Sequence, residues 1–144
     1  PRLTGRQNIM LSGLQLGMPR KLVKERESQI IELADIDDFI DQPVRMYSTG
    51  MRARLGFAIA YFIETDILLI DEALATGDEA FRDKATGLIR GKIDSDQTVV
   101  IVTHSMQIVK TACTRVIQIE QGKSLSEIGV EETIKRYRET ALQT

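Results

Sequence analysis

The stretch Ile67-Leu68-Leu69-Ile70-Asp71-Glu72 decides the fold of this chain. Four consecutive aliphatic residues are typical of a strand that is buried on both faces of a parallel sheet. Two adjacent carboxylates follow directly, and ligands of open parallel sheets bind at the carboxyl ends of the strands. We therefore expect Asp71 and Glu72 to lie at a functional edge of the sheet. The alternative is that both acids only cap the segment that follows them.

The residues after this stretch alternate between strand and helix patterns. A second run of β-branched residues occupies positions 98–102, and a third strand is expected at 115–120. The segments with a helical pattern are 79–92, 106–112 and 131–140. Such an alternation predicts a parallel sheet with right-handed crossovers. The tripeptide Gln121-Gly122-Lys123 is typical of a tight turn.

The residues before the stretch have no strand signal. Thr4 and Gln7 have the spacing of a capping box, which predicts a helix that ends near Gly17. Further helices are expected at 22–33, at 36–40 and at 52–63, the last with buried later turns. We therefore divide the chain into a helical subdomain, residues 1–64, and part of a catalytic core with a closing helix, residues 65–144.

Composition excludes several classes of function. The 144 residues are 42% hydrophobic and 28% charged, which is ordinary for a soluble domain. A net charge of -2 disfavours a nucleic-acid partner held by general electrostatics. The single cysteine, Cys113, allows no internal disulfide and is expected to be a buried side chain on a helix. No apolar stretch approaches the roughly 20 residues that span a bilayer.

A histidine follows the second β-rich run. His104, within Thr103-His104-Ser105, is the only histidine of the chain. An imidazole at the tip of a strand can donate a hydrogen bond to a developing phosphate charge or hold a water molecule. A purely structural role is the alternative.

A third candidate element precedes the helix expected at 52–63. Ser48-Thr49-Gly50 is followed by Met51 and Arg52, without an acidic residue. The N-terminus of a helix presents free backbone N–H groups and a partial positive charge, and glycine allows a ligand to approach closely. The pattern therefore predicts an anion-binding site, with a simple N-cap as the alternative.

The order of these elements resembles the ABC-type ATPase domain over essentially the whole chain. The resemblance implies an α/β fold, a partial P-loop NTPase of ABC type with a parallel RecA-like sheet and an α-helical subdomain. It implies roles for four elements: Tyr47-Ser48-Thr49-Gly50-Met51 as signature motif, Asp71 and Glu72 as Walker B pair, Asp78 as D-loop aspartate and His104 as switch histidine. Asp71 would then organise Mg²⁺, Glu72 would polarise the attacking water, and the signature residues and Asp78 would contact ATP.

Within that family, three stretches are similar to the branch that exports bacterial surface polysaccharides, including O-antigen, capsule and teichoic acid. They are Leu3-Thr4-Gly5-Arg6-Gln7-Asn8-Ile9, the Tyr-Ser-Thr-Gly-Met signature, and Asp71-Glu72-Ala73-Leu74-Ala75-Thr76-Gly77-Asp78. Thr49 and Met51 depart from the generic Leu-Ser-Gly-Gly-Gln signature. The resemblance implies a homodimer of ATPase subunits on a transmembrane permease subunit, peripheral to the cytoplasmic face of the membrane.

The phosphate-binding loop, the adenine-stacking aromatic and the Q-loop glutamine of the family pattern are missing from these residues. A P-loop has the form G-x-x-x-x-G-K-[ST], and the nearest match, Gly122-Lys123-Ser124, has Ile117 in place of the first glycine. We interpret it as a hairpin turn and expect the chain to be a fragment. Alone, it should bind ATP poorly and expose a sheet edge and apolar surface. A soluble ABC ATPase and a non-catalytic interaction module remain as alternatives.

Overall fold

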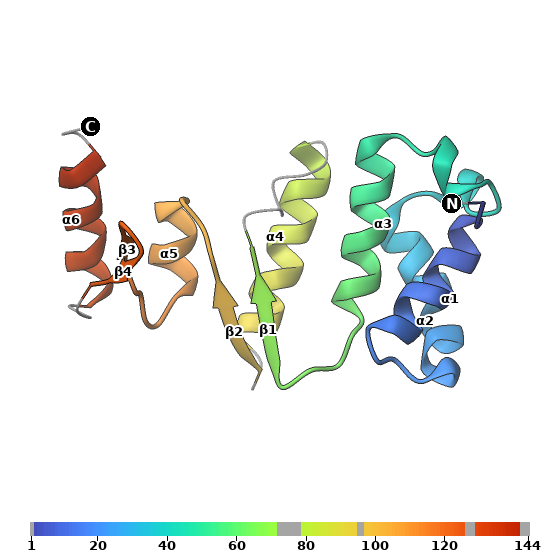
Figure 1. The fold of residues 1–144 in the computed structure, drawn as a ribbon, viewed down its shortest axis with the longest axis horizontal. Coiled ribbons are helices and arrows are strands. Elements are labelled where there is room, and N and C mark those ends of the chain that lie inside the picture. The colour runs from blue at the N-terminus through green and yellow to red at the C-terminus, as the bar shows by residue number, and fades with distance from the viewer. Residues whose placement is uncertain (1, 72–78, 95–96, 126–128, 142–144) are drawn as a thin grey trace. The chain divides into compact units, whose positions relative to one another are not determined.

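The computed structural model describes residues 2–71, 79–94, 97–125 and 129–141 (Figure 1). The chain divides into two compact units, Pro1–Val100 and Ile101–Thr144.

The first unit begins with three packed helices, α1 (Gly5–Gln15), α2 (Arg20–Ala34) and α3 (Thr49–Tyr61) (Figure 1). Two short 3-10 helices, η1 (Asp37–Phe39) and η2 (Val44–Met46), connect α2 to α3. The predicted all-helical character of this segment is confirmed. The helix expected at 36–40 is a single 3-10 turn, and the helix expected at 52–63 already begins at Thr49 because Ser48 caps it.

The capping box at the start of α1 is present as predicted. Thr4 Oγ1 accepts a hydrogen bond from the Gln7 amide at 3.3 Å, and Gln7 Oε1 accepts one from the Thr4 amide at 3.0 Å. The next two amides donate to the chain before η2: Gly5 N–H to Gln42 O at 3.2 Å and Arg6 N–H to Ile40 O at 3.1 Å. The first turn of α1 is therefore held by side chains and by a distant segment of backbone.

Apolar side chains between the three helices form the core of this unit. The largest fully buried side chains belong to all three helices and to the segment between α2 and η1: Ile9, Val23, Ile30, Ile36 and Leu55. In α3, the predicted burial of the later turns holds for Ala58 and Ile59, whereas Ala60 is exposed. Burial of an aliphatic side chain stabilises a fold by roughly 1.5–3 kcal/mol, so this cluster is a main source of stability.

Arg6 links α1 to α2 and to the segment after η1. Its guanidinium pairs with Glu27 and with Asp41, where the distance from Nε to Oδ1 is 2.9 Å. The Arg6 guanidinium holds the pKa of the Asp41 carboxyl below its ordinary value, and the hydrogen bond to Asp41 in turn raises the pKa of Arg6. The Asp41 carboxylate is exposed, so this pair orients the segment more than it stabilises the fold.

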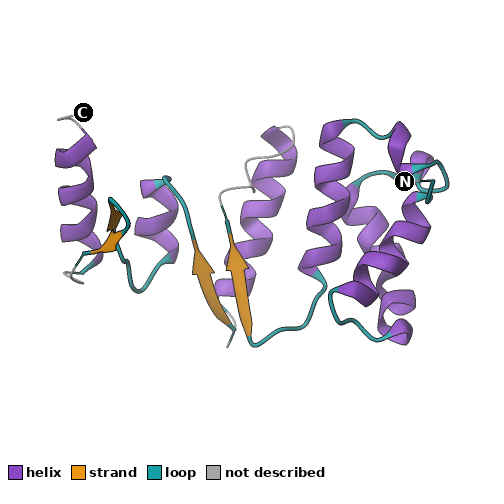
Figure 2. Ribbon diagram, viewed as in Figure 1, coloured by secondary structure: helices purple, strands orange, loops and turns teal. Residues whose placement is uncertain are grey.

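Two strands follow the helices in the chain. β1 (Ile67–Ile70) and β2 (Thr98–Ile101) are hydrogen-bonded neighbours, joined in sequence by α4 (Glu79–Ile93). Both arrows point in the same direction in Figure 2, so the predicted parallel pairing is confirmed. α4 packs against α3, since the rings of Phe57 and Phe81 meet edge to face with centroids 5.5 Å apart.

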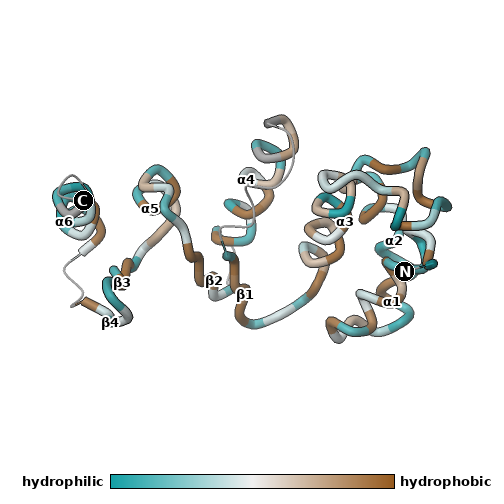
Figure 3. Tube along the Cα trace, turned by 45° about the horizontal axis from the view of Figure 1, so that its top comes forward, coloured by the Kyte–Doolittle hydropathy of each residue, from teal (hydrophilic) through white to brown (hydrophobic). Residues whose placement is uncertain are grey.

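The prediction that both strands are buried on both faces is wrong for the described residues. Exposure alternates along β1: Ile67 and Leu69 are 57% and 74% exposed, whereas Ile70 is 8% exposed. Val100 of β2 is also exposed, and Figure 3 shows hydrophobic colouring along both strands. Within the part of the chain that the structure describes, one face of this sheet therefore lacks a covering layer, and the predicted exposed apolar surface is present.

The strand expected at 115–120 does not extend the parallel sheet. In the described residues β3 (Ile119–Glu120) pairs in an antiparallel fashion with β4 (Lys123–Ser124). Gln121 and Gly122 connect them, with φ values of 49° and 75°. Positive φ at both central residues is the mark of a type I′ hairpin turn. This geometry confirms the tight turn and the interpretation of Gly122-Lys123-Ser124 as a hairpin.

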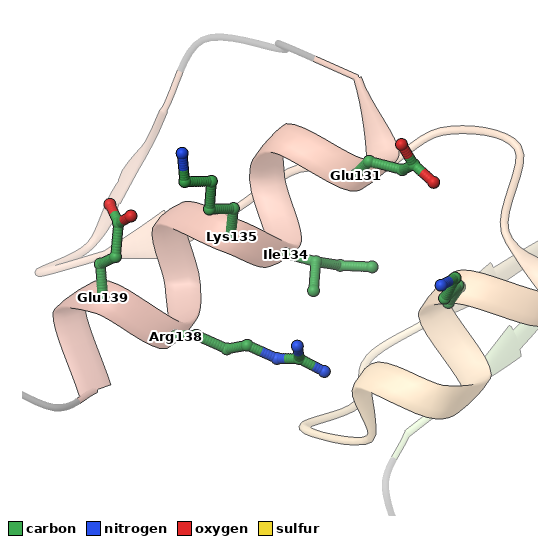
Figure 4. Close-up of a pocket in the computed structure, with 6 residues that line it drawn as sticks. Glu131, Ile134, Lys135, Arg138 and Glu139 are labelled. Carbon is green, nitrogen blue, oxygen red and sulfur yellow. The ribbon is translucent and has the colours of Figure 1, made fainter.

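The second unit contains the helices α5 (Met106–Ala112) and α6 (Val130–Ala141), which pack against each other. Val109 of α5 and Ile134 of α6 are buried, and Figure 4 shows Ile134 and Arg138 projecting from α6 toward the neighbouring helix. A hollow of ≈ 310 Å³ lies here, and its lining comes from both helices. Cys113 is half-buried at the C-cap of α5, and burial raises the pKa of its thiol.

No helix among the described residues has the length and apolar character needed to cross a membrane.

Candidate functional site

The N-terminus of α3 has the geometry of an anion-binding site. Ser48 is the N-cap of α3. Its Oγ accepts a hydrogen bond from the Met51 amide at 3.1 Å, and its carbonyl oxygen accepts one from the Arg52 amide at 3.1 Å. The amides of Thr49 and Gly50 lie in the first turn, where an α-helix offers no internal acceptor. Because Ser48 and Thr49 are exposed, an anion can reach this turn. The N-cap interpretation is confirmed, and the anion-binding site stays a prediction.

Gly50 is not required by the packing of the fold. A Cβ built on Gly50 meets only Ser48 Oγ within 4 Å, at 3.8 Å, which is an ordinary contact. Its φ is not in the positive range that favours glycine. Glycine at this place instead leaves the amides of the first turn open to close approach, which fits a phosphate group.

The segment before the site is anchored from two sides. The ring of Tyr47 is buried, 3% exposed, and its Oη donates a hydrogen bond to Phe39 O at 2.8 Å. Burial raises the pKa of the Tyr47 phenol. From the other side, the Arg52 guanidinium donates to Tyr47 O at 2.5 Å and to Thr49 Oγ1 at 3.3 Å. Arg52 therefore holds the backbone that leads into α3.

Sequence reasoning assigned no role to Arg52. The only available signal was its spacing, because Arg52 lies three residues after Thr49 on the same helix, and residues three apart face each other. Its stronger contact, with the carbonyl of Tyr47, involves backbone outside the helix and leaves no sequence pattern.

Asp71 lies directly after β1, as predicted. The strand ends with Ile70, which is buried, whereas Asp71 is exposed. An exposed carboxylate at this end of a strand fits magnesium, which binds through one or two carboxylates and keeps water and phosphate oxygens as its other ligands. No group of three or more metal-binding side chains is assembled among the described residues. Glu72 and Asp78 lie outside the described residues.

His104 lies in the loop between β2 and α5, within the second unit, and is exposed. Its Nδ1 is 3.0 Å from the hydroxyl oxygen of Tyr137 on α6. The residues on either side of His104 also make hydrogen bonds. Thr103 Oγ1 accepts a hydrogen bond from the Ser105 amide at 3.0 Å, and Ser105 Oγ caps α5 by accepting one from the Ile108 amide at 3.4 Å. The loop that carries His104 is thus well defined, and sequence reasoning missed Tyr137.

The structure brings Ser48, Thr49, Gly50 and Met51 together in the first turn of α3. Asp71 belongs to the same unit as this turn, and His104 belongs to the other unit. Each of the three predicted elements lies at the expected end of its own helix or strand, and their joint role in one site stays a prediction.

Comparison with known proteins relates this chain to ATP-binding proteins. A family model described as ABC transporter matches residues 1–75. The O-antigen export system ATP-binding protein RfbB of Klebsiella pneumoniae is 45% identical over 140 residues, which are 96% of this chain and 56% of that protein. The teichoic acids export ATP-binding protein TagH of Levilactobacillus brevis is 44% identical over 138 residues, 95% of this chain and 38% of that protein.

A solved structure shares the fold. The ATP-binding cassette MJ0796, in a dimeric post-hydrolysis state bound to ADP and Pi, matches with a TM-score of 0.69 at 23% identity, over 90% of this chain and 58% of that one. This match confirms the predicted α/β fold class. The present chain spans about 38% to 56% of the length of the two curated relatives.

Proposed function

This chain belongs to the ABC transporter family, and from this premise we propose that it is part of an ATPase subunit that drives export of a cell-surface polysaccharide. Two such subunits would hydrolyse ATP at their shared interface. The names of the O-antigen and teichoic acid relatives support the polysaccharide branch. The observation that carries the proposal is the open first turn of α3, where Gly50 leaves room that the fold itself does not need.

Each predicted residue has a role in this proposal. Ser48, Thr49 and Gly50, with Met51 beside them, would close over the γ-phosphate of ATP held by the opposite subunit, with Asp78 contributing at the same interface. Asp71 would hold Mg²⁺, which would supply positive charge to neutralise the charge that develops on the phosphates. Glu72 would polarise the attacking water as general base. His104 would donate a hydrogen bond near the γ-phosphate.

The partners follow from the same proposal. Residues 3–42, within the proposed helical subdomain 1–64, would face a transmembrane permease subunit and transmit the closure of the dimer. Exposed apolar side chains in α1 and just after it support a protein partner here: Leu11, Leu14 and Leu16 are between 42% and 52% exposed. Residues 65–144 would carry the catalytic half, and the assembly would be peripheral to the cytoplasmic face of the membrane.

Replacement of Gly50 by alanine in the intact protein tests the proposal. The added methyl group fits the fold, so we expect stability to stay constant or to rise by up to about 1 kcal/mol. The same methyl group would keep a phosphate away from the amides of Thr49 and Gly50. We therefore expect ATP-dependent dimerisation and steady-state ATP turnover to fall about tenfold or more, since small misplacements in a reacting geometry have large effects.

Gly56→Ala is the matched control. Gly56 lies in the same helix, and a Cβ there meets nothing within 4 Å. We expect this variant to dimerise and turn over ATP like the unmodified protein. Equal activity of Gly50→Ala and Gly56→Ala would contradict the phosphate site at α3. The reading frame upstream of residue 1 gives a second check, because the catalytic proposal requires a glycine-rich loop that ends in Gly-Lys-Ser or Gly-Lys-Thr.

A further inference from the structure

Tyr137 makes a hydrogen bond with the only histidine of the chain. Oη of Tyr137 and Nδ1 of His104 are 3.0 Å apart. Tyr137 lies on α6, three and four positions after Ile134 and Thr133, both of which are buried. Residues at this spacing share one face of a helix, so Tyr137 belongs to the buried face of α6, the helix that packs against α5. The hydroxyl is therefore presented to His104 by a helix that is itself anchored.

The contact with Tyr137 acts on the ring of His104, whereas other hydrogen bonds hold the loop backbone. The loop backbone is held by Thr103 and Ser105, which bond to amides on the C-terminal side of His104. These bonds involve the residues beside His104 and set neither the rotamer nor the tautomer of its ring. The hydrogen bond with Tyr137 involves Nδ1 and therefore distinguishes this nitrogen from Nε2.

We infer that Tyr137 is a positioning residue that orients the His104 ring and keeps its proton on Nε2. The inference rests on the proposed function, in which His104 donates a hydrogen bond near the γ-phosphate.

The tautomer follows from the chemistry of the two groups. A neutral imidazole has one nitrogen that donates and one that accepts. The phenol oxygen is the weaker acceptor of the pair because its lone pair is delocalised into the ring, whereas an imidazole nitrogen without a proton is a strong acceptor. Tyr137 Oη–H therefore donates to Nδ1, and the ring proton lies on Nε2. Only this tautomer offers a donor to a phosphate oxygen, because the other would present a lone pair to a developing negative charge.

Tyr137→Phe in the intact protein tests the inference, since it keeps the ring that packs on α6 and removes only the hydroxyl. We expect kcat for ATP turnover to fall by about two- to tenfold, the size of one hydrogen bond between partly exposed groups, with KM for ATP little changed. The matched control is Tyr61→Phe, at another half-buried tyrosine on a helix. We expect Tyr61→Phe to leave kcat unchanged.

A spectroscopic measurement reads the tautomer directly. The ¹⁵N chemical shifts of the imidazole nitrogens distinguish protonated from unprotonated sites, and the signals of His104 are assigned by their loss in His104→Gln. We expect a protonated Nε2 and an unprotonated Nδ1 in the unmodified protein, and a mixture of tautomers in Tyr137→Phe. A proton on Nδ1 in the unmodified protein would overturn the inference.

A double-mutant cycle separates positioning from a general effect on folding. If Tyr137 acts through His104, then Tyr137→Phe should change nothing further in a His104→Gln background. An equal fall in kcat in both backgrounds would refute the inference. Failure of the proposed function is distinguishable, because it would appear as normal turnover in Glu72→Gln. Loss of turnover in Glu72→Gln together with unchanged kcat in Tyr137→Phe would reject the role of Tyr137 alone.

Discussion

Glu72→Gln in the intact protein is expected to abolish ATP turnover while ATP-dependent dimers still form. Glutamine has nearly the same size as glutamate but no negative charge, so it can occupy the same place without accepting a proton from the attacking water. General-base catalysis contributes roughly 10²- to 10⁴-fold to a rate, and we expect the loss to fall in this range. Phosphate release at saturating Mg-ATP measures turnover, and size-exclusion chromatography with ATP measures the dimer.

The control for this variant is Glu64→Gln. Glu64 is exposed and precedes β1, so it lies in the same segment of sequence but not at the carboxyl end of the strand. Its conversion to glutamine makes the same change in net charge, and we expect no effect on turnover. Unchanged turnover in Glu72→Gln would remove Glu72 from its proposed role. Loss of turnover together with loss of the ATP-dependent dimer would indicate a defect in binding instead of catalysis.

Local features of the fold were well predicted because they depend on residues close in sequence. The bond between Thr4 and Gln7 spans three positions, and so does the bond from the Met51 amide to Ser48. The turn at Gly122 likewise follows from the ability of glycine to adopt a positive φ. Each of these patterns leaves a direct mark on spacing and residue type.

The wrong predictions concern the burial and the pairing of strands, which depend on the segments that pack against each strand. The aliphatic residues of β1 are compatible with burial on both faces, but Leu69 is 74% exposed. The prediction was wrong because the hydrophobicity of a strand does not reveal which layers cover its sheet. The strand expected at 115–120 carries the same residue types as a parallel strand. In the structure β3 pairs with β4, which follows it after a short turn. The alternation of strand and helix patterns therefore predicted the wrong sheet for this segment.

The same distinction applies to the candidate site. Ser48, Gly50, Asp71 and His104 could be selected because each follows or precedes a regular element in a recognisable way. Tyr137 could not, since 33 positions separate it from His104 and only the packing of α6 brings it near. Contacts that tune a site come from tertiary structure, and spacing along the chain does not encode them.

The largest expected effect on stability comes from Gly5→Ala. A Cβ on Gly5 would lie 2.1 Å from Tyr47 Oη and 2.9 Å from both Ile40 Cδ1 and Ile40 O. We expect the free energy of unfolding to fall by about 3 kcal/mol, at the upper end of the usual range for overpacking. Proteins of this size are stable by roughly 5–15 kcal/mol, so a denaturant titration would show a clear decrease in midpoint. Gly56→Ala, where the methyl group meets open space, should show no loss.

Neither the backbone of Gly5 nor the ring of Tyr47 can move away from the added methyl group at a low cost in free energy. The backbone of Gly5 is held by its bond to Gln42 O, and that of Arg6 by its bond to Ile40 O. On the other side, the ring of Tyr47 is buried and its hydroxyl donates to Phe39 O. The clash therefore has to be relieved by a shift of α1 or of Tyr47, and either shift disrupts hydrogen bonds together with packing.

A second substitution identifies the source of the strain. Tyr47→Phe removes the oxygen nearest to the new methyl group, at the expense of the bond to Phe39, while the contact with Ile40 O remains. The double variant Gly5→Ala/Tyr47→Phe should therefore lose less stability than the sum of the two single variants. Simple additivity would show that Gly5 and Tyr47 are not coupled. Because Tyr47 directly precedes the N-cap of α3, coupling would also mean that the start of α1 helps to hold the proposed phosphate-binding turn in place.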